Sequence, residues 1–191
     1  MGRPSRHDAD HLLDVAVALA AAGGPGAVTA VAVAREAGAP SGSVYHRFPG
    51  RSALLAALWL RTVERFQEGF LAALETMPAT EAAPTAARHV VAWSRAHPRE
   101  CGVLLYGAAD FGERHWPAEA QERLERANGR VAGALRALAG RLGRDDVERI
   151  VIATVDLPYA VVRRHLVSGR AIPESAESTV ADCAVALLEA S

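Results

Sequence analysis

The chain has 191 residues, of which half are hydrophobic, 23% are charged and only 5% are aromatic. This length suffices for one or two domains with a real hydrophobic core, and the formal net charge of −1 excludes a protein that coats nucleic acid through overall positive charge. Ala, Val and Leu dominate, and Ala, Leu and Arg favour helix. Because no alternating strand pattern stands out, we predict an all-α fold.

The first fifty residues predict a basic arm followed by three helices. The arm covers residues 1–7, and the first helix covers 8–22 and ends at a Gly-Gly-Pro-Gly sequence. A second helix follows Thr29, whose hydroxyl suits an N-cap, and ends at Ala37. A third, short helix covers residues 41–47. We therefore predict an amino-terminal domain of three helices.

The second and third helices are separated by a turn at Gly38, which is the layout of a helix-turn-helix whose second helix enters the DNA major groove. Small side chains at the start of that helix can approach base edges, and larger polar ones can reach phosphates. For each of these polar residues taken singly, helix capping or simple exposure to solvent is the competing explanation. The candidate DNA-contacting residues are Thr29, Ser41, Gly42, Ser43, Tyr45, His46, Arg47 and Arg51.

The remaining chain predicts six more helices, separated by Pro- and Gly-containing breaks. They cover residues 51–76, 85–96, 99–109, 118–142, 145–168 and 173–189. A linker over 77–84 separates the first two of them, and Pro158 should kink the helix that contains it. We expect a domain boundary after residue 50, with 1–50 as the helix-turn-helix domain and 51–191 as a second helical domain.

Residues 8–60 resemble the DNA-binding region of the tetracycline-repressor (TetR) family of bacterial transcriptional regulators. The matching residues are Thr29, Val33, Ala34, Ala37, Gly38, Ala39, Ser41, Gly42, Ser43, Val44, Tyr45, Phe48 and Arg51. One position departs from the family pattern, because Pro40 stands where the family usually has a Ser that caps the third helix. We therefore expect Ser41 to provide the cap instead.

The resemblance implies a ligand-responsive transcriptional regulator, most simply a repressor, that binds a palindromic operator in double-stranded DNA as a homodimer and is released by a small organic effector. The 141 residues of 51–191 favour this reading, since DNA docking alone needs far fewer. The alternatives are a DNA-binding regulator without an effector and, more distantly, a small helical enzyme. No nucleophile–base set, phosphate loop, dinucleotide fingerprint or metal-ligand cluster appears in the sequence, so we expect no enzyme activity, no cofactor and no metal site.

An effector pocket between the later helices is the second functional expectation, and the resemblance implies that aromatic side chains line it. Asp156 interrupts an apolar run beside Pro158, and a carboxylate there must either pair with an Arg of a neighbouring helix or anchor a ligand. Both interpretations remain open from the sequence. The candidate pocket residues are Trp93, Tyr106, Phe111, Asp156 and Tyr159.

The last two predicted helices carry apolar faces with little else in the sequence to bury them, which favours an isologous homodimer. The candidate interface residues are Val161, Val162, Leu166, Val180, Ala184, Leu187 and Leu188. The sequence begins with no signal-peptide pattern and contains no apolar run of membrane-spanning length. We therefore expect a cytoplasmic protein with no membrane partner.

Overall fold

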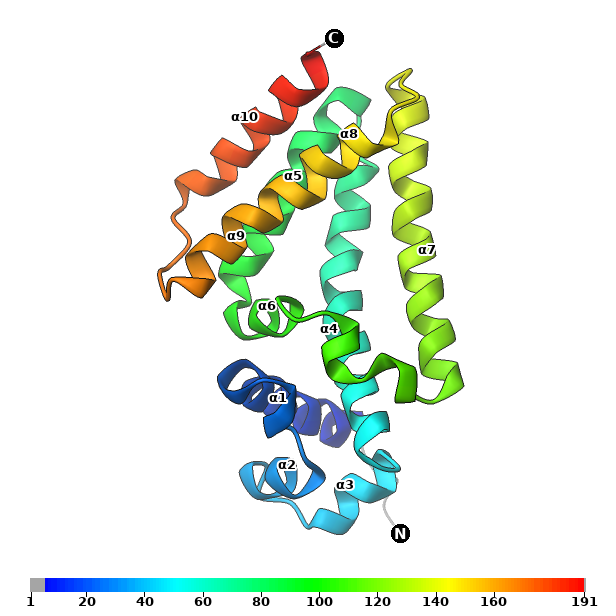
Figure 1. Ribbon diagram of the computed structural model, residues 1–191, viewed down its shortest axis with the longest axis vertical. Coiled ribbons are helices and arrows are strands. Elements are labelled where there is room, and N and C mark those ends of the chain that lie inside the picture. Colours follow the sequence, from blue (N-terminus) through cyan, green and yellow to red (C-terminus); the bar gives the residue numbers. More distant parts are fainter. Residues whose placement is uncertain (1–5, 191) are drawn as a thin grey trace. The chain divides into compact units, whose positions relative to one another are not determined.

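The computed structural model describes residues 6–190, and every regular element within that range is helical (Figure 1). The all-α prediction is therefore confirmed. The chain divides into two compact units: one comprises the residues up to Val63 together with Arg99–Glu125, and the other comprises Glu64–Pro98 and the residues from Arg126 onward. The boundary predicted after residue 50 separates a DNA-binding part from the rest by function, whereas these units are defined by contacts. The boundary therefore stays a prediction.

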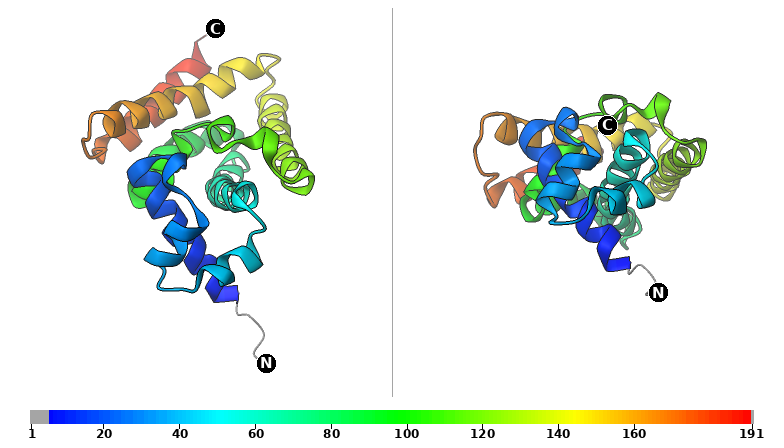
Figure 2. Two further views of the ribbon diagram at one scale, coloured as in Figure 1. Left: turned by 60° about the horizontal axis from the view of Figure 1, so that its bottom comes forward. Right: turned by 90° about the horizontal axis from the view of Figure 1, so that it is seen from below.

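The first unit contains the amino-terminal helices, the start of the long helix α4 and a later segment of the chain. Its elements are α1 (Arg6–Gly23), the 3-10 turn η1 (Pro25–Ala27), α2 (Ala30–Glu36), α3 (Ser41–Arg47), the first part of α4 (Arg51–Leu74), α6 (Pro98–Leu104), the 3-10 turns η2 (Ala108–Phe111) and η3 (Glu113–His115), and the first part of α7 (Ala118–Arg141). In Figure 2, α1, α2 and α3 lie side by side within this unit, in agreement with their mutual contacts.

The core of the first unit forms where the apolar faces of α1, α3 and α4 meet the later segment. Leu12, Val44 and Leu58 have no exposed surface, and Val103 and Phe111 join the same cluster, equally buried. Full burial of such side chains contributes about 1.5–3 kcal/mol each relative to exposure. Residues 99–125 therefore pack with the amino-terminal helices, which the sequence-based division did not indicate.

The second unit contains α5 (Ala79–Ala96) and the remaining helices. They are the rest of α4 and α7, α8 (Val147–Val151), the π turn η4 (Ile152–Asp156), α9 (Leu157–Val167) and α10 (Ser175–Glu189). In Figure 1, α9 and α10 lie alongside α5, and both helices contact it. None of the helices in residues 6–190 is long and apolar enough to cross a membrane.

Helix α5 corrects the prediction of a linker over 77–84, because it begins at Ala79 and contains Pro84. Ala82, Ala83 and Ala86 are completely buried, so small side chains line the face of α5 that packs within the unit. Pro84 removes one backbone hydrogen bond from the helix. Burial of this alanine face stabilises the turns before Pro84 more than the missing bond destabilises them.

The predicted helix over 145–168 is a continuous helical run from Val147 to Val167 whose middle is a π turn. The N–H of Leu157 bonds to the carbonyl of Ile152, five residues back, and Pro158 follows directly. The wide turn lies where Pro158 has no N–H to give an α-helical bond, and it relieves the contact between the proline ring and the preceding turn. Counted as one, this run brings the described residues to the nine predicted helices.

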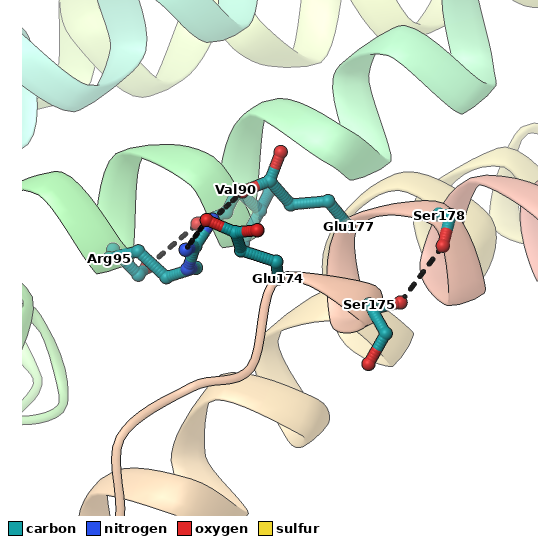
Figure 3. A network of polar contacts seen from close by, with 7 residues as sticks. Val90, Arg95, Glu174, Ser175, Glu177 and Ser178 are labelled. Atoms are coloured by element: carbon teal, nitrogen blue, oxygen red, sulfur yellow. Dashed lines mark hydrogen bonds and ion pairs between the residues drawn. The ribbon is translucent and has the colours of Figure 1, made fainter.

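Arg95 ties the end of α5 to the start of α10 (Figure 3). Its Nη2 lies 3.1 Å from Oε1 of Glu174, and its Nη1 pairs with Oε1 of Glu177. The hydrogen bond to Glu177 is the main cause that raises the pKa of Arg95; desolvation opposes it, and the hydrogen bond to Glu174 adds a smaller increase. Within α10, the hydroxyl of Ser178 donates to the carbonyl of Ser175 over 3.0 Å. The loop between α9 and α10 is thereby anchored at its α10 end.

Candidate nucleic-acid interface

The turn between α2 and α3 has the geometry that its sequence predicts. The Thr29 hydroxyl oxygen accepts a hydrogen bond from the N–H of Ala32 over 3.1 Å and caps α2. Gly38 has a φ of 63°, in the left-handed region that favours glycine, and the following Ala39 N–H bonds to the carbonyl of Ala34. The predictions of Thr29 as the cap and Gly38 as the turn residue are confirmed.

The start of α3 differs from the expectation. Pro40 itself is the N-cap residue, and Ser41 is the first helical residue rather than the cap. The carbonyl of Pro40 accepts from the Ser43 N–H over 3.0 Å and from the Ser43 hydroxyl over 2.6 Å. The hydroxyl hydrogen of Ser43 is thus engaged inside the helix, so a base contact by Ser43 would use its oxygen as an acceptor.

Helix α3 separates a buried face from an exposed one. Val44 is fully buried and Phe48, just after the helix, is 9% exposed, while Tyr45 is 52% exposed. The other predicted contacts divide in the same way: Thr29, Ser41, Gly42, His46 and Arg51 are exposed, and Ser43 and Arg47 are half-buried. The buried apolar side chains hold α3 against the domain, and the small and polar side chains of the helix face outward.

Protein atoms engage the guanidinium of Arg51, which was predicted as a DNA contact. Its Nε donates to the carbonyl of Val28 over 3.0 Å, and its Nη2 donates to the carbonyl of Pro25 over 2.7 Å. The residue was predicted as a phosphate contact. In the structure it holds the segment between α1 and α2 against the start of α4.

Residues 12–58 match the family model described as bacterial regulatory proteins, tetR family. This segment is the DNA-binding domain of the TetR family. The match covers α2, α3 and the turn between them, which are the elements whose caps and turn are described above. The amino-terminal helices of this chain are therefore the helix-turn-helix domain of TetR-family regulatory proteins. No curated protein sequence matches the chain.

Solved structures share the fold of this chain along nearly all of its length. A tetR-family regulatory protein from Rhodococcus RHA1 is 18% identical with a TM-score of 0.75, covering 96% of this chain and 97% of its own. The fatty acid degradation regulator FadR from Bacillus halodurans is 16% identical with a TM-score of 0.72, covering 95% and 98%. FadR from Bacillus subtilis, in complex with stearoyl-CoA, is 14% identical with a TM-score of 0.71, covering 95% and 97%.

The aromatic residues predicted to line an effector pocket are distributed over both units of the chain. Phe111 is completely buried in the first unit, where its ring lies 5.3 Å from Trp59 and 6.2 Å from Tyr106, centroid to centroid. It is a core residue rather than a pocket wall, because none of its surface is accessible. In the second unit, Trp93 is 9% exposed and packs edge-on against Phe66 at 5.3 Å.

Asp156 and Tyr159 lie on an exposed part of the helical run from Val147 to Val167. Asp156 is exposed, and no ion pair or hydrogen bond joins it to an Arg within residues 6–190. The run is less buried than its apolar sequence suggests, since Ile152 and Tyr159 are 40% and 39% exposed. The predicted pairing with an Arg is therefore not found, and a ligand-anchoring role for Asp156 stays a prediction.

The predicted dimer interface needs a similar correction. Val162, Val180 and Ala184 are at most 1% exposed, because the apolar faces of α9 and α10 pack against α5 of the same protomer. They are core residues and cannot present surface to a second copy. The other predicted members, Val161, Leu166, Leu187 and Leu188, are half-buried.

The structure adds exposed apolar residues that the sequence analysis did not place in an interface. They are Ile152, Val167 and Val185, and Tyr159 had been assigned to the pocket instead. Their signal in the sequence is weak, since it consists of single apolar residues at positions between the buried ones. Among the described residues, no group of three or more His, Cys, Asp or Glu side chains could hold a metal ion.

A polar pair between buried Gln67 and exposed Asn128 in the second unit also escaped the sequence analysis. Gln67 of α4 is 6% exposed, and its Nε2 donates to Oδ1 of Asn128 on α7 over 3.3 Å. Its Oε1 is buried and has no hydrogen-bond partner among the described residues. Such an orphaned acceptor is costly and calls for an explanation, of which a bound donor is one.

Proposed function

We propose that this chain is a repressor that binds a palindromic operator as a homodimer and is released by a small organic effector. One observation carries the DNA-binding part of the proposal. Helix α3 follows the Gly38 turn, rests on buried Val44 and Phe48, and presents Ser41, Gly42 and Tyr45 to solvent. That arrangement suits insertion of α3 into a major groove.

The direct contacts divide into two kinds on chemical grounds. Small residues at the start of α3, Ser41 to Ser43, allow the helix to approach base edges and so carry sequence preference. Tyr45 and His46, exposed farther along the helix, are proposed to bind phosphates and so position the domain without reading sequence. A two-fold dimer would place two α3 helices about 34–36 Å apart, one turn of DNA.

Exposed apolar surface on the carboxy-terminal helices supports the homodimer. Ile152, Tyr159, Val167 and Val185 are each at least 37% exposed, and all lie on the run from Val147 to Val167 or on α10. Clusters of exposed large apolar side chains on soluble proteins mark interaction surfaces. Pairing the same surface of two copies would bury these residues in an isologous interface.

The effector part of the proposal is supported by Gln67 and by the fold neighbours. The orphaned Oε1 of Gln67 would be satisfied by a ligand hydroxyl or amine. A protein of the same fold, FadR from Bacillus subtilis, is solved in complex with stearoyl-CoA. The packing of Phe111 against Trp59 favours the alternative, a regulator without an effector, because core side chains fill that part of the first unit.

Selection of DNA by the purified chain tests the proposal. The full-length protein, incubated with a random-sequence duplex library, is expected to enrich a palindromic consensus. Gly42→Asp is expected to abolish enrichment, because it adds bulk and negative charge to the outer face of α3. A Cβ at Gly42 meets no protein atom within 4 Å, so the variant should fold.

The matched control places the same change on α7. A Cβ at Gly129 also meets nothing within 4 Å, so Gly129→Asp should fold and should enrich the same consensus as the wild type. Absence of any enriched sequence with the wild-type protein would refute operator binding. Equal enrichment by Gly42→Asp and wild type would remove α3 from the interface.

Release by an effector is tested on the selected duplex. Stearoyl-CoA is the first probe, followed by smaller organic molecules that carry a hydroxyl or amine. A compound that weakens DNA binding must itself bind more weakly in the presence of DNA, by the same factor. Gln67→Leu should blunt the response while leaving affinity for DNA intact. If no compound shifts DNA affinity, the regulator without an effector is the better description.

A further inference from the structure

The guanidinium of Arg51 joins the two ends of the helix-turn-helix. Arg51 is the first residue of α4 and follows α3 after three residues. Its partners are the carbonyls of Val28, at 3.0 Å, and Pro25, at 2.7 Å. Val28 immediately precedes Thr29, the cap of α2. The two hydrogen bonds therefore close the chain around the whole of α2, the turn and α3.

The chemistry of this closure suits Arg in particular. Pro25 begins the 3-10 turn η1 and Val28 follows its end, and the Pro25 carbonyl also accepts from the Val28 N–H over 3.3 Å. The guanidinium is planar and presents several donors in a fixed fork, so one side chain reaches both carbonyls. A lysine ammonium on a flexible stem keeps the charge and loses that fixed geometry. The side chain of Val28 is fully buried, so its backbone is held by the core as well.

The same segment is confined from a second direction. Gly24 has a φ of 69°, and a Cβ there would lie 3.1 Å from the hydroxyl oxygen of Tyr106. Gly24 N–H also bonds to the carbonyl of Ala20 at the end of α1. The segment from Gly24 to Val28 therefore lies between Tyr106 and Arg51, and we name it the α1–α2 connector.

We propose that Arg51 is a positioning residue, which sets the presentation of α3 by fixing the α1–α2 connector to the start of α4. It would then affect DNA affinity through the protein backbone rather than through a phosphate. This inference rests on the proposed DNA binding. It replaces the sequence-based expectation that Arg51 is itself a phosphate contact.

Two variants separate the positioning role from a phosphate contact. Arg51→Lys keeps the charge and loses the fork, and Arg51→Ala loses both. If Arg51 positions α3, both variants should bind the selected duplex about tenfold or more weakly, with the wild-type salt dependence. If it contacts a phosphate, Arg51→Lys should bind like the wild type. Arg51→Ala should then lose roughly one unit of salt slope per half-site. That second pattern would overturn the inference.

Amide hydrogen exchange in the DNA-free protein tests the connector independently of operator binding. Both variants should exchange faster than the wild type over residues 24–30, while α10 keeps its protection and helical circular dichroism is unchanged. Arg35→Ala, which removes an exposed Arg of α2 that pairs with the neighbouring Glu36, is the control for a charge loss in this domain, and its connector should stay protected. Unchanged exchange in both Arg51 variants would overturn the inference. If the wild type selects no DNA, the proposed function fails, whereas the exchange result still decides whether Arg51 fixes the connector.

Discussion

Gly69 on α4 and His89 on α5 approach each other so closely that a Cβ at position 69 would lie 2.3 Å from Cε1 of His89. The imidazole ring cannot simply swing away. Its Nε2 lies 3.1 Å from the carbonyl oxygen of Phe66, to which it donates, and its centroid lies 5.6 Å from the Phe66 ring. The absence of a side chain at Gly69 is thus a condition for packing α4 against α5 in the second unit.

Gly69→Ala should therefore destabilise the protein. Overpacking costs about 1–3 kcal/mol, which outweighs the gain of about 1 kcal/mol that Ala brings to a helix interior. Urea denaturation measures the difference. Gly129→Ala is the matched control, since a Cβ there meets nothing within 4 Å and should stabilise the helix. If Gly69→Ala proves as stabilising as Gly129→Ala, the ring of His89 moves more easily than its contacts indicate.

His89 should make stability depend on pH. Burial is the main cause that lowers its pKa below the ordinary value of 6.5; the hydrogen bond to Phe66 opposes this, and nearby His97 adds to the lowering. A histidine with a lowered folded-state pKa binds fewer protons when folded. Its contribution is fully present above 6.5 and is lost as the pH falls from 6.5 through the folded-state pKa.

Unfolding free energies at about pH 7.5 and about pH 5 measure this dependence. His89→Gln should narrow the difference between the two, because its amide can still donate to the Phe66 carbonyl and does not titrate. An equally large difference in the variant would assign the pH dependence to other groups.

Thr29→Ala should lower the stability of the first unit by about 0.5–2 kcal/mol, because the cap of α2 is lost. Thr29→Ser keeps a hydroxyl that can accept from the Ala32 N–H, and should stay close to the wild type. Thermal unfolding compares the three proteins. A Thr29→Ala protein as stable as Thr29→Ser would show that the 3.1 Å bond contributes nothing measurable.

The homodimer should dissociate when charge enters its apolar surface. The double variant Ile152→Glu, Val185→Glu changes two side chains that are 40% and 37% exposed, so the protomer should still fold. Light scattering should report a monomer for this variant and a dimer for Met77→Glu, a control at a 71% exposed residue in the loop between α4 and α5. If the wild type is monomeric, the proposed homodimer is refuted. If the double variant is dimeric, the dimer interface lies elsewhere on the protein.

The amino acid sequence alone determined the helix-turn-helix. Thr29, Gly38 and Val44 act through caps, turns and helical spacing that extend over a few residues, so their roles are legible from the local sequence. The extents of α3 and α4 followed from the same signals. The π turn was predicted in part, since Pro158 indicates an irregularity in the helix but not whether it is a kink or a π turn.

The tertiary structure decided which apolar faces are buried and by what. Val162 and Val180 carry the same helical pattern whether they pack on α5 or on a second protomer, and only the packed chain shows that α5 covers them. Likewise, nothing near Phe111 in the sequence announces that it joins the core of the amino-terminal helices. Arg51 reaches partners 23 and 26 residues away, and its two carbonyl acceptors carry no side-chain signature. Contacts between distant segments depend on how the helices pack, which local propensities do not encode.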